Sequence, residues 1–490
     1  MGHADYTLAF DWNCYFLVTK PRIMAVMRAP LTRTLILLAL CGLILLPAYT
    51  SALVDIRQAE RALASGDPLA ASSSYEHAAR LLFWRTSLWE QAGRAAFAGQ
   101  NYNEAIRLLE RAPSLSREGW ADLGEAYYQF ERIDETIRVL EQGLNAAGAN
   151  PRMYRLLALA HSAKEDLQSE ATSLENYLAL QEVDAAAHYR LGLLLALHDP
   201  QRAQEEFALA AEQDNTFDPA YETMRSTINL ASLEEDESER LIVIGRGYGL
   251  VQEWRLAHEA FQQAVNANEK NAEAWAWLGE AKQHVGQDGR VELDRAVKMD
   301  PFSANIRALS GLYWKRNDKA QLALAEYQWA VVIEPQNPYW LAALGEAYAQ
   351  LGDLPPALEA YQRAAEVAPS DVAFWRLLAI FCAQYTYQTA ETGVAAAHQV
   401  VLLAPDDAAS YDLLGWLYLA SGLQSEAEAS LQRALKMDPD LASAHLHIGI
   451  LHLQRDERSE AQSHLVKARD LDPNGATGEL AKQLLAQYFP

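Results

Sequence analysis

A small residue, usually glycine, returns about every 34 positions along this 490-residue chain, in similar surroundings each time. Most intervals in the series lie between 31 and 36 residues, and one interval is 53. The members are Ala59, Gly93, Gly124, Ala158, Gly192, Gly245, Gly279, Ser310, Gly345, Ala379, Gly415 and Gly449. A repeat of this length indicates one supersecondary unit stacked many times, because a single unit cannot bury its own apolar face.

The segment 408–441 shows what one unit contains. Tyr411, Leu414, Gly415 and Tyr418 follow the spacing of one helical stripe, and Gly422 ends that helix. A second stripe of Ala427, Leu431 and Ala434 follows and stops at Pro439. Each unit is therefore predicted to be an antiparallel helical hairpin, in which the small residues let the two helices approach closely.

This pattern resembles the tetratricopeptide repeat, whose signature runs Trp, Leu, Gly and Tyr in the first helix and Ala, a large residue, Ala and Pro in the second. The signature recurs at Trp120, Leu123, Gly124, Tyr127 and Leu140, and again at Trp275, Leu278, Gly279, Ala296 and Pro301. It also recurs at Leu344, Gly345, Tyr348, Ala357, Tyr361, Ala364 and Pro369. The resemblance covers about 52–475 and implies an all-α, right-handed superhelical solenoid of about twelve hairpins.

Breaks in the period suggest the domain boundaries. The 53-residue interval predicts two arrays, 55–212 and 238–475, separated by a degenerate or extra helix and an acidic linker over 213–237. An amphipathic helix over 476–490 is expected to cap the last repeat. Two units depart from the pattern: one carries Glu170 at a small-residue site, and the unit at 376–404 is two residues longer at its turn.

The N-terminal region contains an uncharged apolar stretch, 34–54, preceded by Arg28 and Arg33. Its length predicts a transmembrane or signal-anchor helix, with 1–33 cytoplasmic and the repeats on the other side of the membrane. The alternative is a secretory signal that is cleaved near Ala52, because the densest apolar core is only 12 residues long. Residues 1–23 fit neither reading well, so Met24 or Met27 is the expected true start.

The net charge indicates which classes of partner the chain favours, and the cysteines show no pattern of a metal site or a disulfide framework. The net charge is −24, which disfavours nucleic acid and favours basic partners, although such a charge also serves solubility. Cys14, Cys41 and Cys382 have no metal-binding spacing and no paired framework.

No reaction centre is expected. His445, His447 and His452 lie close in sequence, but two of them occupy repeat packing sites and none has the i, i+4 spacing of helical metal ligands. The glycines in 244–249 lack the context of a phosphate-binding loop. The chain is therefore predicted to be no enzyme, with no catalytic, metal or cofactor-binding residue; an alternative role is a subunit that positions another chain's active site.

The resemblance implies a partner groove lined by the first helix of each unit, at positions one and five after the Trp site. Exposed aromatic residues could serve as anchors. The predicted groove residues are Glu90, Arg94, Glu125, Tyr128, Arg246, Glu280, Arg307, Trp314, Glu346, Arg376, Asp412 and Trp416.

The expected function is a non-catalytic scaffold at the outer face of a bacterial-type membrane, which binds a protein or peptide in this groove and assembles a multiprotein complex. The alternative partner is a glycan, with the chain acting as a polysaccharide-binding accessory for envelope or exopolysaccharide export. Trp416 is expected either to anchor a partner or to pack on the next repeat, and the sequence favours neither role over the other.

Overall fold

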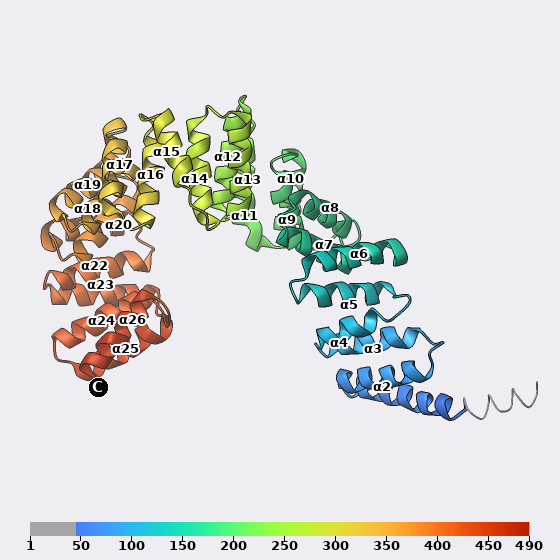
Figure 1. Ribbon diagram of the computed structural model, residues 1–490. Helices are drawn as coiled ribbons and strands as arrows, with labels where there is room; N and C mark the ends of the chain where they lie inside the picture. Colours follow the sequence, from blue (N-terminus) through green and yellow to red (C-terminus); the bar gives the residue numbers. More distant parts are fainter. Residues whose placement is uncertain (1–45, 490) are drawn as a thin grey trace, which may run out of the picture. The chain divides into compact units, whose positions relative to one another are not determined.

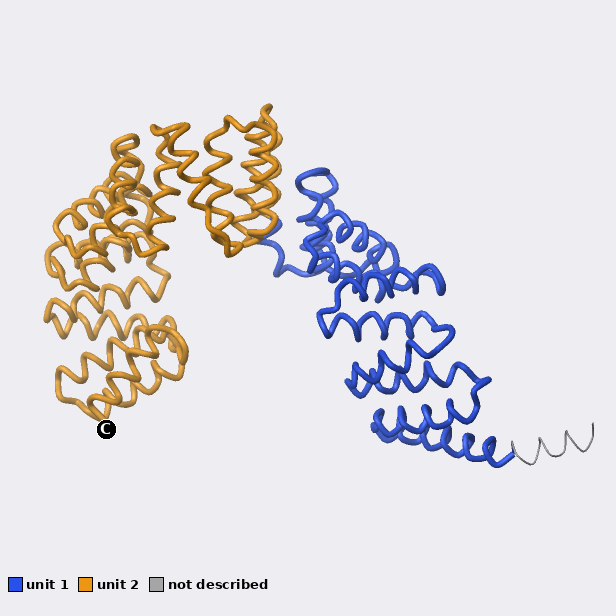
Figure 2. Tube along the Cα trace, in the orientation of Figure 1, with its two compact units in different colours: residues 1–221 blue, residues 222–490 orange. Residues whose placement is uncertain are grey.

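The computed structural model describes residues 46–489 and is all-helical over that range (Figure 1). The predicted cytoplasmic segment 1–33 and most of the predicted apolar helix, 34–45, lie outside the described residues. The described residues form two compact units that divide between Tyr221 and Glu222; they are called unit 1 and unit 2 (Figure 2). The predicted class, an all-α array of helical hairpins, is confirmed for the described residues.

Unit 1 stacks five hairpins in chain order. The first pairs a helix over residues 46–64 with α2 (Pro68–Leu81). The others are α3 (Ser87–Ala98) with α4 (Tyr102–Leu109), α5 (Arg117–Tyr128) with α6 (Ile133–Ala147), α7 (Pro151–Ala163) with α8 (Leu167–Leu178), and α9 (Ala185–Leu195) with α10 (Pro200–Gln213).

The border between the units falls inside α11 (Asp218–Ala231), which follows a short 3-10 helix, η1 (Asn215–Phe217). Within unit 2, a Cβ added to Gly247 would lie 2.3 Å from Thr227 of α11, so this unpaired helix packs closely on the next hairpin. Residues 232–236 are non-helical.

Unit 2 continues with seven hairpins and a final helix. They are α12 (Glu237–Leu250) with α13 (Trp254–Ala267), α14 (Ala272–His284) with α15 (Arg290–Met299), α16 (Ala304–Arg316) with α17 (Ala320–Ile333), α18 (Pro338–Gln350) with α19 (Leu354–Val367), α20 (Val372–Gln384) with α21 (Val394–Leu403), α22 (Ala408–Ala420) with α23 (Gln424–Met437), and α24 (Ala442–Gln454) with α25 (Arg458–Leu471). The last helix, α26 (Ala476–Tyr488), packs on α25.

The repeated glycine works as a contact point between the two helices of a hairpin. A Cβ on Gly245 would lie 2.5 Å from the Phe261 ring, and one on Gly124 would lie 2.3 Å from Leu140. In both hairpins the large residue follows the glycine by 16 positions, one hairpin turn later. Such distances leave no room for a side chain, so the spacing found in the sequence reflects this close packing.

One member of the series was misplaced. The small residue that touches the second helix in the α16–α17 hairpin is Gly311, whose added Cβ would lie 2.7 Å from Tyr327, 16 positions later. The sequence-based choice of Ser310 is therefore wrong by one residue. The irregularity lies one hairpin earlier, where Gly279 meets Leu293 after only 14 positions and Gly289 packs directly on the Gly279 backbone.

The longer unit at 376–404 takes up its extra residues in one π-helical turn, η2 (Thr389–Gly393). Thr386 and Gln388, just before it, have positive φ values of 48° and 52°. The remainder of the hairpin then packs as its neighbours do, with Cys382 and Val400 fully buried.

The first described helix does not end where the sequence analysis ended the apolar segment. It runs on to residue 64, and Ala52, Ile56 and Ala59 are buried in the same core cluster as Tyr75 of α2. Ala52, the predicted cleavage point, is thus part of the first hairpin. Among residues 46–489, no helix combines the length and the apolar character that crossing a bilayer requires.

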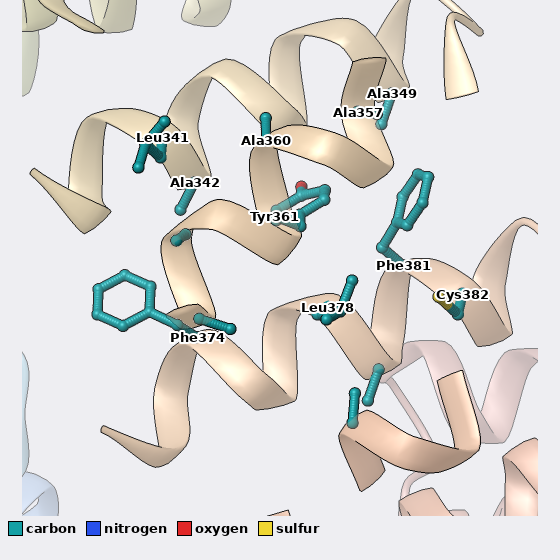
Figure 3. Close-up of a cluster of buried hydrophobic side chains, with 14 of the residues drawn as sticks. Leu341, Ala342, Ala349, Ala357, Ala360, Tyr361, Phe374, Leu378, Phe381 and Cys382 are labelled. Carbon is teal, nitrogen blue, oxygen red and sulfur yellow. The ribbon is translucent and has the colours of Figure 1, made fainter. Parts of the chain in front are cut away.

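An extended apolar core in unit 2 runs from α16 to α22. Figure 3 shows its centre, where Tyr361 of α19 and Phe381 of α20 lie side by side, with ring centroids 5.2 Å apart. Small residues such as Ala357 and Ala360 fill the space between helices. This core is continuous from repeat to repeat, as stacking of incomplete units requires.

Candidate partner-binding groove

The first helices of successive hairpins form one face of each unit, and polar side chains connect them there. Most of the predicted groove residues belong to these connections. They therefore have structural partners, which matters for any role in binding.

In unit 1, Arg94 of α3 donates to Asp122 of α5 at 3.1 Å. Arg152 of α7 donates to the other oxygen of Asp122 at 2.6 Å and to Glu125 at 3.0 Å. Glu90 accepts from the backbone N–H of Ser116, the N-cap of α5, at 3.1 Å, and also from the Ser116 hydroxyl. Three of the four predicted groove residues of unit 1 therefore form hydrogen bonds or ion pairs with a neighbouring repeat.

Tyr128 is the fourth. It is half-buried and lines a shallow hollow with Gln129, Glu131, Ile133 and Ala163. The hollow lies at the turn between α5 and α6, away from the ion pairs formed by Glu125 and Arg94.

In unit 2, the polar connections continue between α12, α14 and α16. The Arg246 guanidinium lies over the Trp277 ring, 5.3 Å from its centroid. Glu280 is buried and accepts two hydrogen bonds from Arg316, each 2.7 Å long, and His284 Nε2 lies 3.1 Å from it. A bidentate pair of this kind is a strong and directional contact.

Arg307 was predicted at the position after the Trp site, and Trp314 was predicted as an exposed aromatic anchor; both have other surroundings in the structure. With Gly311 as the contact residue, Arg307 takes the Trp site: it donates to the Pro301 carbonyl at 3.0 Å and pairs with Glu326 of the second helix at 2.9 Å. Trp314 takes the Tyr site, where it packs against two core clusters and lies under Arg290. The one-residue error at Ser310 corresponds to a rotation of this helix by about 100°, which moves Arg307 from the position after the Trp site to the Trp site itself.

The last three predicted groove residues, Arg376, Asp412 and Trp416, also have partners within the protein. Arg376 pairs with Asp407, the N-cap of α22, at 2.7 Å. Asp412 is buried and lies 2.7 Å from His447 Nδ1. The Trp416 ring stacks on His447 of the next repeat, with centroids 5.1 Å apart and planes 15° apart. One face of this tryptophan is therefore occupied by the protein itself.

Between α18 and α20 the face opens into a cavity of about 490 Å³. Its floor is apolar and includes Ala342, Tyr361, Ile380 and Phe381, and the half-exposed Leu377 stands at its edge. Gln350, Gln384 and Tyr385 supply polar groups at the rim. This is the volume of a site for one large side chain and part of a backbone.

Among the described residues that line this cavity, Glu346 is the only charged one. Its carboxylate forms an ion pair with Lys315 of α16, in the preceding hairpin, at 2.6 Å, and 45% of its side chain is exposed. Burial raises the pKa of Tyr361, and the nearby Glu346 charge adds to the effect. The tyrosine therefore remains a neutral hydrogen-bonding group beside an accessible carboxylate.

Glu346 is the predicted groove residue that lines this cavity. The rule of one and five positions after the Trp site gives Ala342, Glu346 and Ile380, which all line it. Leu377 and Gln384, seven residues apart on α20, and Tyr385, the residue that follows α20, were missed. The repeat signature does not indicate which pair of neighbouring first helices leaves a cavity between them.

The histidines considered as metal ligands form ordinary contacts. His445 and His464 approach at 2.9 Å between their Nδ1 atoms, and His445 Nε2 donates to the Pro439 carbonyl at 3.0 Å. His447 faces Asp412, as described above. Within residues 46–489, no group of three His, Cys, Asp or Glu side chains is arranged to hold a metal ion.

Comparison with known proteins gives distant relatives. The chain is 25% identical over 179 residues to BBSome complex member BBS4 of Xenopus tropicalis, covering 34% of each protein. It is 24% identical over 224 residues to the human Protein O-mannosyl-transferase TMTC1, covering 45% of this chain and 23% of the relative. The chain thus spans about a third or less of these curated relatives. Because one of them is named as a transferase, the absence of enzyme activity stays a prediction.

Solved structures and family models were also compared. A tetratricopeptide repeat protein from Parabacteroides merdae aligns over 51% of this chain and 97% of its own, at 20% identity and a TM-score of 0.39. Two segments match models described as Tetratricopeptide repeat, one over 339–381 and one over 408–441. The first match contains nearly all of α18, all of α19 and the part of α20 up to Phe381. These two segments of the chain are similar to tetratricopeptide repeats.

Proposed function

We propose that this protein is a non-catalytic scaffold that binds an extended segment of a partner protein in unit 2. The cavity between α18 and α20 takes an apolar side chain of that segment. The observation that carries the proposal is this cavity, with an apolar floor and a single accessible carboxylate, on the face formed by the first helices. Pockets that receive anchor side chains are a general means of peptide recognition.

The charge of the cavity defines the partner further. Glu346 is exposed enough to accept a second cation, and the protein carries a net charge of −24. A lysine or arginine next to the apolar anchor would pair with Glu346 and partly replace Lys315. The preferred partner segment is therefore basic and carries a large apolar or aromatic residue.

The second part of the proposal concerns the membrane. The uncharged residues before Ala52 serve as the anchor, and because Ala52 packs in the first hairpin, the anchor ends before that residue rather than at 54. Residues 34–51 are 18 in number, which is at the short end of the range for a spanning helix. One relative is named as a member of a complex, which supports a scaffold role; the glycan alternative has no specific observation in its favour, since Trp416 is stacked on His447.

The cavity is tested with a library of random peptides displayed on phage and selected against the full chain. We expect enrichment of peptides that combine an aromatic or large aliphatic residue with lysine or arginine. Leu377→Arg, which places bulk and positive charge at the cavity edge, should weaken the selected peptides at least about tenfold, or 1.4 kcal/mol. Leu322→Arg on α17 is the matched control, since Leu322 is 46% exposed and does not line the cavity.

Glu346→Gln removes the negative charge of the cavity and keeps the size of the side chain, so it tests how much the charge contributes to peptide binding. It should lower the affinity for basic peptides and flatten the dependence of binding on salt, because one screened ion pair is removed. Equal binding to the wild type and the Leu377→Arg variant, or enrichment of acidic peptides, would show that the cavity is not the partner site.

A further inference from the structure

The turn between α2 and α3 exposes two adjacent aromatic side chains. Phe83 is 73% exposed and Trp84 is 52% exposed, and their rings contact each other edge to face at 5.0 Å. Neither ring belongs to the core cluster of unit 1. A paired phenylalanine and tryptophan at a tight turn is costly to leave in water, which calls for a partner that accepts apolar rings.

The register of the first hairpin shows where this turn lies. His77 Nδ1 of α2 lies 2.7 Å from Asp55 Oδ2 of the helix over 46–64, so the two antiparallel helices are level at these residues. Six residues beyond His77 is Phe83, and six residues before Asp55 is Tyr49, which is 46% exposed. The aromatic turn and the start of the described chain are therefore at the same end of the hairpin (Figure 1).

This end also differs in charge from the rest of the protein. Residues 46–54 and 77–88 contain Arg80 and Arg85 and no carboxylate, in a chain whose net charge is −24. Both arginines are exposed. Arg80 forms an ion pair with Glu76 on the same helix, which leaves its guanidinium at the surface. The twelve residues that precede Leu46 in the sequence, 34–45, carry no charge.

We infer that the Phe83–Trp84 turn docks on the lipid bilayer at the level of the headgroups. Tryptophan and phenylalanine partition into this interface, and Arg80 and Arg85 are placed to pair with lipid phosphates. The turn gives the first hairpin a second contact with the membrane, next to the point where the chain leaves it. The inference rests on the membrane anchor proposed above, and it adds a fixed orientation of the first hairpin relative to the membrane surface.

The test uses the full chain in vesicles of phosphatidylcholine and phosphatidylglycerol, with brominated lipids that quench tryptophan fluorescence at the interface. We expect the Trp84→Phe variant to lose most of the bromolipid quenching seen in the wild type. Trp329→Phe is the matched control, because Trp329 is 48% exposed on α17 of unit 2 and should contribute none of it. Arg80→Gln with Arg85→Gln should reduce quenching of Trp84 in anionic vesicles and have little effect in neutral ones.

Flotation with the vesicles separates this inference from the anchor. If the full chain floats but Trp84→Phe leaves the quenching unchanged, the docking turn is refuted and the anchor stands. If the chain fails to float, the anchor and the docking turn both fall. Crosslinking of residue 84 to a second copy of the chain, without quenching by lipid, would assign the two rings to self-association and overturn the inference.

Discussion

Single side chains in this protein serve mainly to join one repeat to the next. Arg152, for example, connects α7 to both Asp122 and Glu125 of α5, and the Glu280–Arg316 pair does the same between α14 and α16. These residues therefore contribute to the packing of neighbouring hairpins, as do Glu90, Arg376 and Asp412 on the same face. A substitution that weakens partner binding at such a site needs a test of folding beside it.

Two histidines of the last repeats predict that this part of the protein is less stable at acidic pH. Burial lowers the pKa of His464 to about 4, and the nearby His445, His452 and Lys467 add to the shift; burial also lowers the pKa of His445. The unfolded chain takes up these protons near pH 6.5 and the folded chain does so only at lower pH. The free energy of unfolding of the last repeats should therefore fall as pH drops from about 6.5 towards 4, by up to about 1.4 kcal/mol per pH unit for each histidine.

Amide hydrogen exchange in α24 and α25, followed over this pH range, measures the effect. His464→Leu should remove a large part of the slope, whereas His398→Leu, on an exposed residue of α21, should leave it in place. An unchanged slope in His464→Leu would mean that other groups control the acid response.

At the scale of the helix pair, one buried ion pair replaces the usual small residue. Glu170 of α8 is buried, and Arg190 of α9 donates to its two oxygens at 2.7 and 3.0 Å. Arg190→Leu leaves a buried carboxylate without its cation and should cost about 3–5 kcal/mol. Glu170→Ala restores the small residue found at this site in other repeats and should cost clearly less.

Urea unfolding followed by circular dichroism compares the two variants, and the double variant completes the cycle. A large coupling energy is expected, because each single change removes the same contact. If Glu170→Ala proves as harmful as Arg190→Leu, packing of the glutamate stem rather than its charge dominates at this site.

The helical hairpins were predictable from the sequence, whereas the register of one hairpin and the opening of the cavity were not. The hairpins were predictable because Gly124 and Gly245 each face a large residue 16 positions later, and that spacing recurs in the sequence. The α16 hairpin was misread because the shortening lies in the preceding turn, where Gly289 packs on Gly279, and only the contact of Gly311 with Tyr327 reveals the register. Glu346 of the cavity was predicted as a groove residue, and Ile380 follows the same repeat rule, but the opening of the cavity depends on which side chains of α18 and α20 leave space.

Across the whole molecule, each hairpin mainly contacts its neighbours in sequence, so stability is a sum of local terms rather than the property of one core. The chain divides at 221/222, inside α11, and Thr227 of that helix packs on Gly247 of unit 2. A cut before α11 should therefore leave two folded pieces. Fragments 46–213 and 214–490 are each expected to be helical and to unfold cooperatively, and their circular dichroism spectra should add up to that of residues 46–490.

A shorter fragment, 232–490, provides the matched comparison, because it lacks α11 and leaves Gly247 uncovered. Its midpoint of thermal unfolding should be lower than that of 214–490, and faster hydrogen exchange should be confined to α12 and α13, since a lost neighbour affects the adjacent hairpin first. Equal stability of 214–490 and 232–490 would assign α11 to a linker without a packing role. Failure of 214–490 to fold would mean that unit 2 depends on unit 1, contrary to a sum of neighbouring contacts.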